Sequence, residues 1–119
     1  MDIRKIIYEK LSADTDLIKL LPDKCIYTAV SDDAGTYPVV VLSIIDDVPS
    51  LHADDLEIHS DVRFQLTIIT DDGEYDAIEQ LIKNDMTEIN ATRKITTDIK
   101  EDNKYEHILQ YVISNNYDE

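Results

Sequence analysis

Apolar residues recur at helical spacing in three segments of the chain. The first follows Asp2, which can cap a helix over residues 3–11. The second is a shorter helical stretch that follows Asp14, another capping residue, and is stopped by Pro22. The third, from Tyr75 to Met86, has one apolar stripe, so we expect this helix to cover the face of a sheet.

Five other segments show strand patterns, either alternation with a period of two or a run of β-branched residues. They are Lys24 to Thr28, Val39 to Ile45, Ile58 to Ile68, Ile95 to Ile99 and Tyr105 to Ile113. The run that Pro38 opens is nearly continuous, so we expect it to be central in a sheet or covered on both faces. Asp46 to Asp55 is rich in acids and contains Pro49, and is predicted to be a loop.

In chain order these elements are helix, strand, strand, strand, helix, strand, strand. Runs of strands separated by single helices favour an α+β fold with a mainly antiparallel sheet of four or five strands. We count the two N-terminal helical segments as one interrupted helix, so two helices would pack on the sheet. The length of 119 residues fits a single α+β domain over residues 1–119, in which residues 115–119 are frayed.

Negative charge is concentrated in the middle half of the chain. Between Cys25 and Ile82 there are thirteen carboxylates and one base, Arg63, so this segment carries −12 of the net charge of −15. Such a field repels a phosphate backbone and an anionic membrane, so we expect no specific nucleic-acid binding and no membrane association. No apolar run approaches the ~20 residues of a membrane span. The lone Cys25 is expected to be a buried thiol in a reducing compartment.

Templates for catalysis do not fit the sequence. Gly35 and Gly73 stand alone, so there is no glycine-rich phosphate loop, and no pattern places a histidine beside Cys25. His59 and Asp61 share one face of a strand and could both reach a cation, although the solvated start of a strand explains them as well. We therefore expect no enzymatic activity, no catalytic residue, no cofactor and no dedicated metal site.

Four Asp-Asp pairs lie at the ends of predicted elements: Asp32-Asp33, Asp46-Asp47, Asp54-Asp55 and Asp71-Asp72. Divalent cations bind such carboxylates, but none of the pairs has the spacing of an EF-hand loop. Asp favours turns and caps by itself, and Asp71 with Glu74 has the spacing of a capping box. Turn formation is the expected role, and weak divalent binding where several copies meet is the alternative.

Val48, Leu51 and Leu56 are apolar residues within or beside the predicted acidic loop, with no obvious core to enter. A loop that folds back on its own sheet would explain them. The alternative is a segment that packs on a neighbouring subunit, and these three residues are our hypothetical subunit interface. The exposed edges of a small open sheet would offer a second contact surface.

The order of elements carries a family resemblance. An amphipathic helix and an Asp-led apolar turn precede a short strand that ends in Ile26-Tyr27. A Tyr37-Pro38 strand opening, an acidic loop and an alternating strand from Val62 to Ile68 follow, before a helix and a closing pair of strands. Over nearly the full chain this layout resembles the siphophage, or prophage, tail-terminator and tail-completion proteins, which join tail to head.

The resemblance implies a structural protein of the virion. Such subunits form a six-membered ring on the finished tail tube, stop its polymerisation and present a face to the head connector. The implied partners are other copies of the chain, the tail tube protein and the head-completion or connector protein. The implied location is the host bacterial cytoplasm during assembly and the tail-head junction of the virion afterwards.

In such a ring, Asp54, Asp55 and Glu57 are predicted to face the lumen, where negative charge would let DNA slide rather than bind. One feature departs from the family pattern. The segment from Asp46 to Glu57 is shorter than a long arm of a tube-type subunit would require, so its contacts with neighbours stay open.

A rival function belongs to another class. An acidic inhibitor or DNA mimic would block a basic nucleic-acid-binding partner, and a net charge of −15 on 13.7 kDa permits this. Against it, the acids cluster at element ends and do not line one face. A mimic should bind basic proteins with steep salt dependence, whereas a terminator should form rings. A small metal-dependent enzyme is a third interpretation, which no constellation of residues supports.

Overall fold

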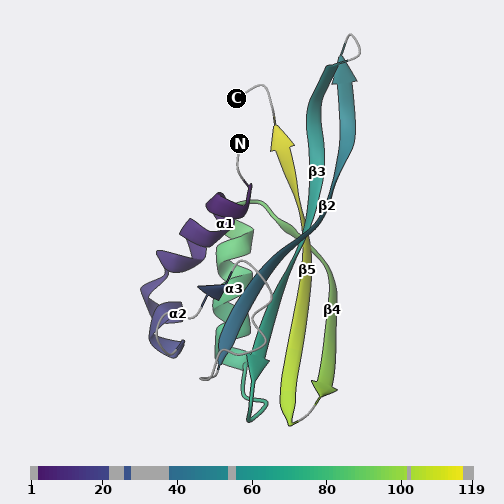
Figure 1. Cartoon of the computed structure of the whole chain (residues 1–119). Coiled ribbons are helices and arrows are strands. Elements are labelled where there is room, and N and C mark those ends of the chain that lie inside the picture. Colours follow the sequence, from purple (N-terminus) through teal and green to yellow (C-terminus); the bar gives the residue numbers. More distant parts are fainter. Residues whose placement is uncertain (1–2, 22–25, 28–37, 54–55, 102, 117–119) are drawn as a thin grey trace.

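The computed structural model describes residues 3–21, 26–27, 38–53, 56–101 and 103–116. Within these residues the chain forms the elements α1 (Ile3–Ser12), α2 (Thr15–Leu20), β1 (Ile26–Tyr27), β2 (Val39–Ala53), β3 (Leu56–Thr70), α3 (Asp76–Glu88), β4 (Thr92–Glu101) and β5 (Lys104–Asn116). Figure 1 shows the helices on one side of a strongly twisted sheet. The expected α+β fold is confirmed. The interrupted first helix is two separate helices, so three helices accompany the sheet.

The strands form one five-stranded sheet in the order β1-β2-β3-β5-β4. The four long strands pair antiparallel with their neighbours, whereas the two residues of β1 pair in parallel with Val40 and Val41. After β3 the chain passes through α3, returns as the outer strand β4 and turns back as β5. Asn103, in the turn between β4 and β5, has a φ of 66°, a left-handed conformation that asparagine tolerates.

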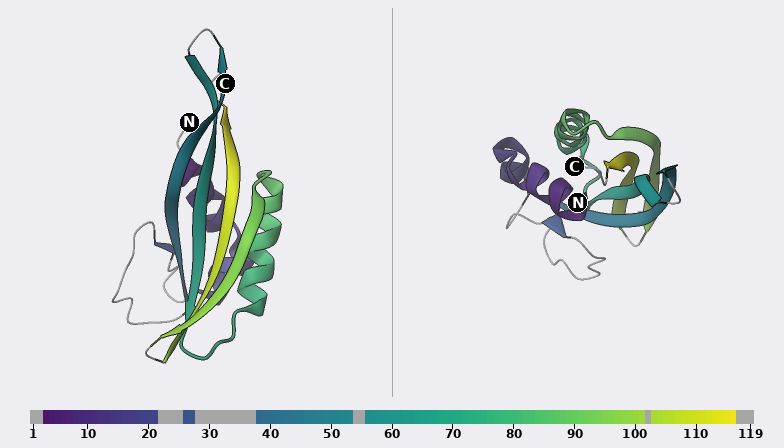
Figure 2. Two further views of the ribbon diagram at one scale, coloured as in Figure 1. Left: turned by 90° about the vertical axis from the view of Figure 1, so that its right-hand side faces the viewer. Right: turned by 90° about the horizontal axis from the view of Figure 1, so that it is seen from above.

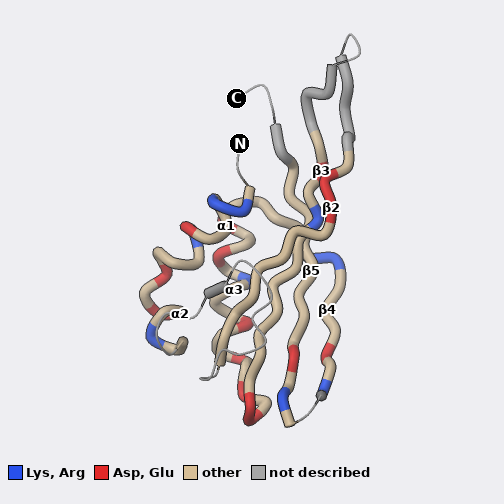
Figure 3. Tube along the Cα trace, in the orientation of Figure 1, with Lys and Arg blue, Asp and Glu red and all other residues tan. Residues whose placement is uncertain are grey.

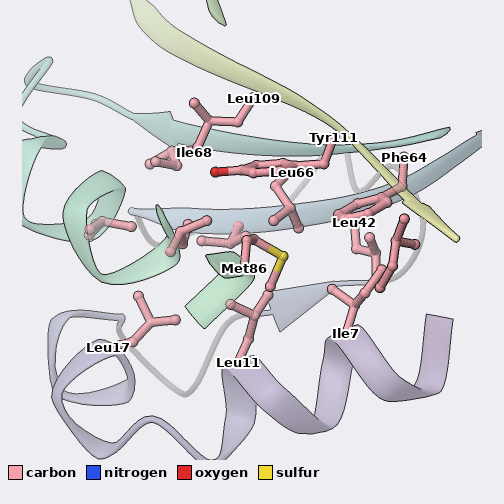
Figure 4. Packing of buried hydrophobic residues seen from close by; sticks show 14 of the residues in the cluster. Ile7, Leu11, Leu17, Leu42, Phe64, Leu66, Ile68, Met86, Leu109 and Tyr111 are labelled. Carbon is pink, nitrogen blue, oxygen red and sulfur yellow. The ribbon is translucent and has the colours of Figure 1, made fainter. Parts of the chain in front are cut away.

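The core is formed by buried apolar residues of the helices and of one face of the sheet. The side and end views of Figure 2 show the helices lying along that face. On α1, Ile3, Ile7 and Leu11 recur every four residues and are buried. From the sheet, the rings of Phe64 and Tyr111 stack with their centroids 5.6 Å apart (Figure 4). Burial of each such side chain contributes about 1.5–3 kcal/mol to folding, so this apolar layer attaches the helices to the sheet.

The N-cap expected at Asp14 is present. Its Oδ1 atom accepts hydrogen bonds from the backbone N–H groups of Asp16 and Leu17, at 3.1 and 3.2 Å. These are two of the donors that the first turn of a helix leaves without an intrahelical partner. The cap therefore explains why the chain restarts as α2 directly after α1 ends.

The capping box expected from Asp71 and Glu74 does not form. The helix α3 begins at Asp76, and its N-cap residue Tyr75 makes no side-chain capping bond. Instead, Asp72 accepts a hydrogen bond from the backbone N–H of Glu74 at 2.9 Å. The carboxylate of Asp72 therefore stabilises the turn before the helix and does not cap the helix. Asp side chains often form such local turn bonds in competition with helix caps.

The loop predicted over residues 46–55 is wrong. β2 continues to Ala53 and β3 starts at Leu56, so the two strands form one long hairpin. Its register shifts between Ile44 and Asp46 and on both sides of Leu51. Acids and a proline interrupt the alternation on which the prediction depended, and bulges let the strand continue past them.

The far end of this hairpin extends beyond the rest of the domain. Toward this end, β4 stops pairing with β5 at Thr92, and β5 stops pairing with β3 at Asn116, opposite His59. Beyond that point β2 and β3 are the two described strands that continue the sheet. We call Val48–Ala53 together with Leu56–Asp61 the arm, and Figure 1 shows it extending past the helices. The Cα radius of gyration is 15.2 Å. A compact domain of this length would have about 13.5 Å. The segment from Asp46 to Glu57 is thus part of an extended hairpin, and its contacts with neighbouring subunits stay open.

Candidate assembly surface

Among the strands that the structure describes, none pairs with the outer side of β4 or with most of the outer side of β2. β4 pairs with β5 on its inner side and with no other described strand. β2 pairs outward with β1 at Val40 and Val41, and within the described ranges its outer edge from Leu42 onward has no strand partner. Backbone N–H and C=O groups along such edges can accept another strand. The open edges expected from the sequence are therefore present at β2 and β4.

Exposed apolar side chains gather on these two edge strands. The described residues include six large exposed apolar side chains: Tyr8, Leu20, Ile45, Val48, Ile95 and Ile99. The last four belong to β2 and β4 and are between 43% and 52% exposed. A single exposed apolar residue needs no explanation, but the sharing of two open edges by four of them indicates a contact surface.

The apolar side chains of β4 lie on the face of the sheet that the helices leave uncovered. Asp98 contacts His107, which is buried on the helix side of the sheet. Ile99 follows Asp98 directly, and Ile95 has the same phase in the alternation, so both point away from the helices.

Of the predicted interface residues, Val48 is the one whose side chain is described, and it is exposed on β2. It is in register with Asp61, which precedes the buried Val62, so Val48 also points away from the helices. Leu51 and Leu56 lie in the strands of the arm, but their side chains are outside the described part.

The predicted lumen-facing acids are not placed. Asp54 and Asp55 lie outside the described residues, as does the side chain of Glu57, whose backbone belongs to β3. Cys25 and the pair Asp32-Asp33 also lie outside them. The orientation of these acids toward a lumen stays a prediction.

The two edges differ in charge. β4 begins with Arg93 and Lys94 and has no acid before Asp98. Residues 46–61, which form the arm and its base, contain six acids and no Lys or Arg. Figure 3 shows the basic start of β4 and the acids where β2 and β3 leave the body of the domain. The start of β4 is therefore basic, whereas β2 carries Asp46 and Asp47 and continues into a hairpin with further acids.

At the base of the arm, Arg63 pairs with Asp46 across β2 and β3. The Nε atom of Arg63 donates to Oδ1 of Asp46 at 2.8 Å, and its Nη2 atom contacts Oδ2. The hydrogen bond from Arg63 lowers the pKa of the Asp46 carboxyl group. Asp46 was predicted to be a turn residue, but it lies in a strand and stabilises the register beside a bulge.

A buried histidine between two carboxylates is a feature that the sequence analysis missed. His107 on β5 contacts Glu79 of α3 through Nε2 and Asp98 of β4 through Nδ1. The ring of Tyr75 stacks on His107 with centroids 4.0 Å apart, and its hydroxyl donates to Asp98 at 3.1 Å. Lys83 reaches the other oxygen of Glu79 at 3.2 Å. Three of these contacts, from His107 to Glu79 and from Tyr75 to His107 and Asp98, join α3 and its N-cap residue to the β4–β5 hairpin.

The chemistry of this cluster is that of a structural clamp. A general base or metal ligand needs an imidazole nitrogen with an accessible lone pair, and both nitrogens of His107 already face carboxylates. The hydrogen bond from His107 lowers the pKa of Asp98, and burial followed by the hydrogen bond to Asp98 raises that of Tyr75. The alternation of the last strand places His107 on the same face as the apolar Leu109, which indicates that it is buried. Its partners could not be predicted, because they lie far away in the chain.

A second buried charge site lies between the helices. Asp85 on α3 is only 7% exposed, and its Oδ2 atom has no hydrogen-bond partner in the described structure. Burial, and then the hydrogen bond to Asp14, raises the pKa of Asp85 to about 7. The nearby Lys10, which pairs with Glu88, lowers it in part. This carboxyl group therefore changes its charge near neutral pH.

No protein-family model and no curated protein matches the chain. In the segments that the structure describes, no helix is long and apolar enough to cross a membrane. The same segments hold no group of three or more His, Cys, Asp or Glu side chains arranged for a metal ion. Function must therefore be inferred from the open edges, the arm and the distribution of charge.

Proposed function

We propose that this chain is a structural subunit of a phage tail, a tail-terminator or tail-completion protein whose copies form a ring of six. The ring caps the tail tube and docks on the head connector. The observation that carries the proposal is the arm, which extends past the helices as a two-stranded ribbon. The resemblance in element order supplies the particular class.

The arm supports assembly because, among the described strands, its outer part is held in the sheet by a single strand pairing. An isolated two-stranded hairpin is at best marginally stable in water, since it has no apolar layer to cover. Beyond the end of β5 at Asn116, the arm pairs within the sheet only as β2 with β3. A ribbon of this kind gains stability when it lies on another molecule, and in a ring of identical subunits that molecule is the next copy.

The charge supports a control on this assembly. Copies that each carry a net charge of −15 repel one another, and salt screens the repulsion. We expect a monomer at low ionic strength and a discrete hexamer as sodium chloride or magnesium is added. Native mass spectrometry across protein and salt concentration measures this, and negative-stain electron microscopy shows whether the hexamer is a ring.

An arm-deleted variant makes the test specific. Asp47 and Val62 are in register, so residues 48–61 can be replaced by an Asn-Gly turn that closes a shorter hairpin. We expect this variant to fold, by circular dichroism, and to stay monomeric under conditions in which the native chain forms hexamers. Because the deletion also removes four acids, the control keeps the arm and neutralises Asp54, Asp55, Glu57 and Asp61 as amides. That control should assemble at lower salt than the native chain.

A different result would favour the acidic inhibitor. A chain that is monomeric at every salt and protein concentration, and that binds a basic DNA-binding protein with affinity falling steeply as salt rises, would fit a DNA mimic. An arm-deleted variant that still forms hexamers would contradict the role given to the arm.

A further inference from the structure

The outer edges of β2 and β4 are more complementary in charge to each other than either edge is to a second copy of itself. The outer edge of β4 is basic at its start and carries Ile95 and Ile99. The outer edge of β2 is followed by an acidic arm and carries Ile45 and Val48. We infer that β4 of one copy pairs with β2 of the next, so that neighbouring copies share one continuous antiparallel sheet. The inference rests on the proposed ring and names its interface.

Strand direction permits this pairing without turning a subunit over. β2 is antiparallel to β3, β3 to β5 and β5 to β4, so β2 and β4 run in opposite directions within one copy. When β4 is placed beside β2 of a second copy with the same faces aligned, the new pair is antiparallel. Val48 of one copy and the two isoleucines of the other then lie on the same helix-free face, where cross-strand apolar pairs form.

The length and position of the free stretches define the contact. β1 occupies the outer edge of β2 at Val40 and Val41, and Pro49 cannot donate a backbone hydrogen bond. Among the described strands, none pairs with the outer edge of β2 from Leu42 to Val48, a length that the ten residues of β4 can cover. This stretch lies toward the arm, so the second copy is displaced along the strands, and the acids of the arm come near its Arg93 and Lys94.

Pairing of like edges is less favourable. Two β4 strands placed antiparallel about a twofold axis at Thr97 keep opposed residues on the same face and would set Lys94 opposite Lys100, although Ile95 would then lie opposite Ile99. Two β2 edges would bring together two acidic arms. Like charges directly opposite each other destabilise a strand pair. The favoured contact therefore joins two different edges, and such head-to-tail contacts close into rings.

Lysines on an edge strand can also serve to prevent pairing, so the test must distinguish the two roles. Two variants, Ile95→Asp and Val48→Asp, each place a charge on one edge. Leu20→Asp makes the same change at an exposed apolar residue on α2. We expect native mass spectrometry in high salt to show at least tenfold weaker association for each edge variant. The Leu20 control should associate as the native chain does.

A mixture of the two edge variants gives the decisive result. Ile95→Asp keeps an intact β2 edge and Val48→Asp keeps an intact β4 edge, so an equimolar mixture should form a dimer and nothing larger. The dimer also shows that both variants are folded. If the mixture stays monomeric, or if either variant alone forms the native hexamer, pairing of these edges is wrong while the ring can stand. A native chain that is monomeric in all conditions overturns both the ring and its interface.

Discussion

The substitution Asp85→Asn tests whether the buried carboxyl between α2 and α3 titrates near neutral pH. The usual pKa of 3.8 rises to about 7 in the folded chain, chiefly by burial and then through Asp14. Each pKa unit corresponds to about 1.4 kcal/mol of differential stability. The shift of about three units therefore corresponds to about 4 kcal/mol, a large part of the ~5–15 kcal/mol that stabilises a domain.

The sign follows from where the proton is held. Below the unfolded pKa the carboxyl is protonated in both states and the burial costs nothing. As the pH rises toward about 7, the unfolded chain releases the proton while the folded chain keeps it, so stability falls. Above about 7 the full destabilisation is present. An asparagine is never ionised and can still donate to Asp14, so the variant avoids this loss.

The assay is urea unfolding followed by circular dichroism at several pH values between 5 and 8.5. Relative to the native chain, the variant should gain about 2 kcal/mol between pH 5 and pH 7, and only a small further amount up to pH 8.5. Other titrating groups are common to both chains and cancel in the difference. The control Asp72→Asn removes an exposed charge and should change stability by less than about 0.5 kcal/mol at each pH. A difference between Asp85→Asn and native chain that stays constant with pH would refute the reasoning.

Three further substitutions test single contacts. Tyr111→Phe removes a buried hydroxyl that has no partner in the described structure, so calorimetry should show stability unchanged or raised by about 1 kcal/mol, and a clear loss would reveal a missed partner. Asp14→Ala removes the α2 cap at a cost of about 1 kcal/mol. Urea titrations should show that this cost is smaller at pH 8 than at pH 5, because Asp14→Ala also removes the carboxylate that raises the pKa of Asp85. The variant Asp14→Asn should preserve the cap. Asp98→Asn should destabilise the chain at pH 7 and lose its effect in acid, since a lowered pKa gives stability that disappears as the pH falls through it. The exposure of Asp98 limits that loss to below about 1 kcal/mol, and an equal loss at pH 3 and pH 7 would contradict it.

The parts of the fold that sequence predicted are those that local spacing determines. The stripe of α1, the cap at Asp14 and the alternation of β5 each depend on residues within one or two turns or on one strand. The arm could not be predicted in this way. Its apolar residues do not alternate regularly and are interrupted by Pro49 and flanked by acids, and residues 48–53 are a strand because β3 pairs with them.

The candidate site was predictable only in part, for the same reason. Open edges follow from a small sheet, and the exposed Val48 could be singled out as an apolar residue beside acids. The clamp on His107 does not, because Tyr75, Glu79 and Asp98 come together only when α3 packs on the β4–β5 hairpin. The pKa of Asp85 depends in the same way on contact between separate helices.

The acidic charge and the edges of the sheet act over different distances, and this difference predicts how the proposed assembly depends on salt. Repulsion between copies extends about 30 Å at 0.01 M salt, beyond the 28 and 22 Å widths of the domain, but only about 8 Å at physiological ionic strength. A new strand lies about 4.8 Å from its neighbour. In low salt, copies should therefore repel one another before their edges can meet. In physiological salt, pairing between the edges should determine whether copies associate. If attraction between the basic start of β4 and the acidic arm dominated instead, added salt would weaken association, so the sign of the salt dependence separates the two effects.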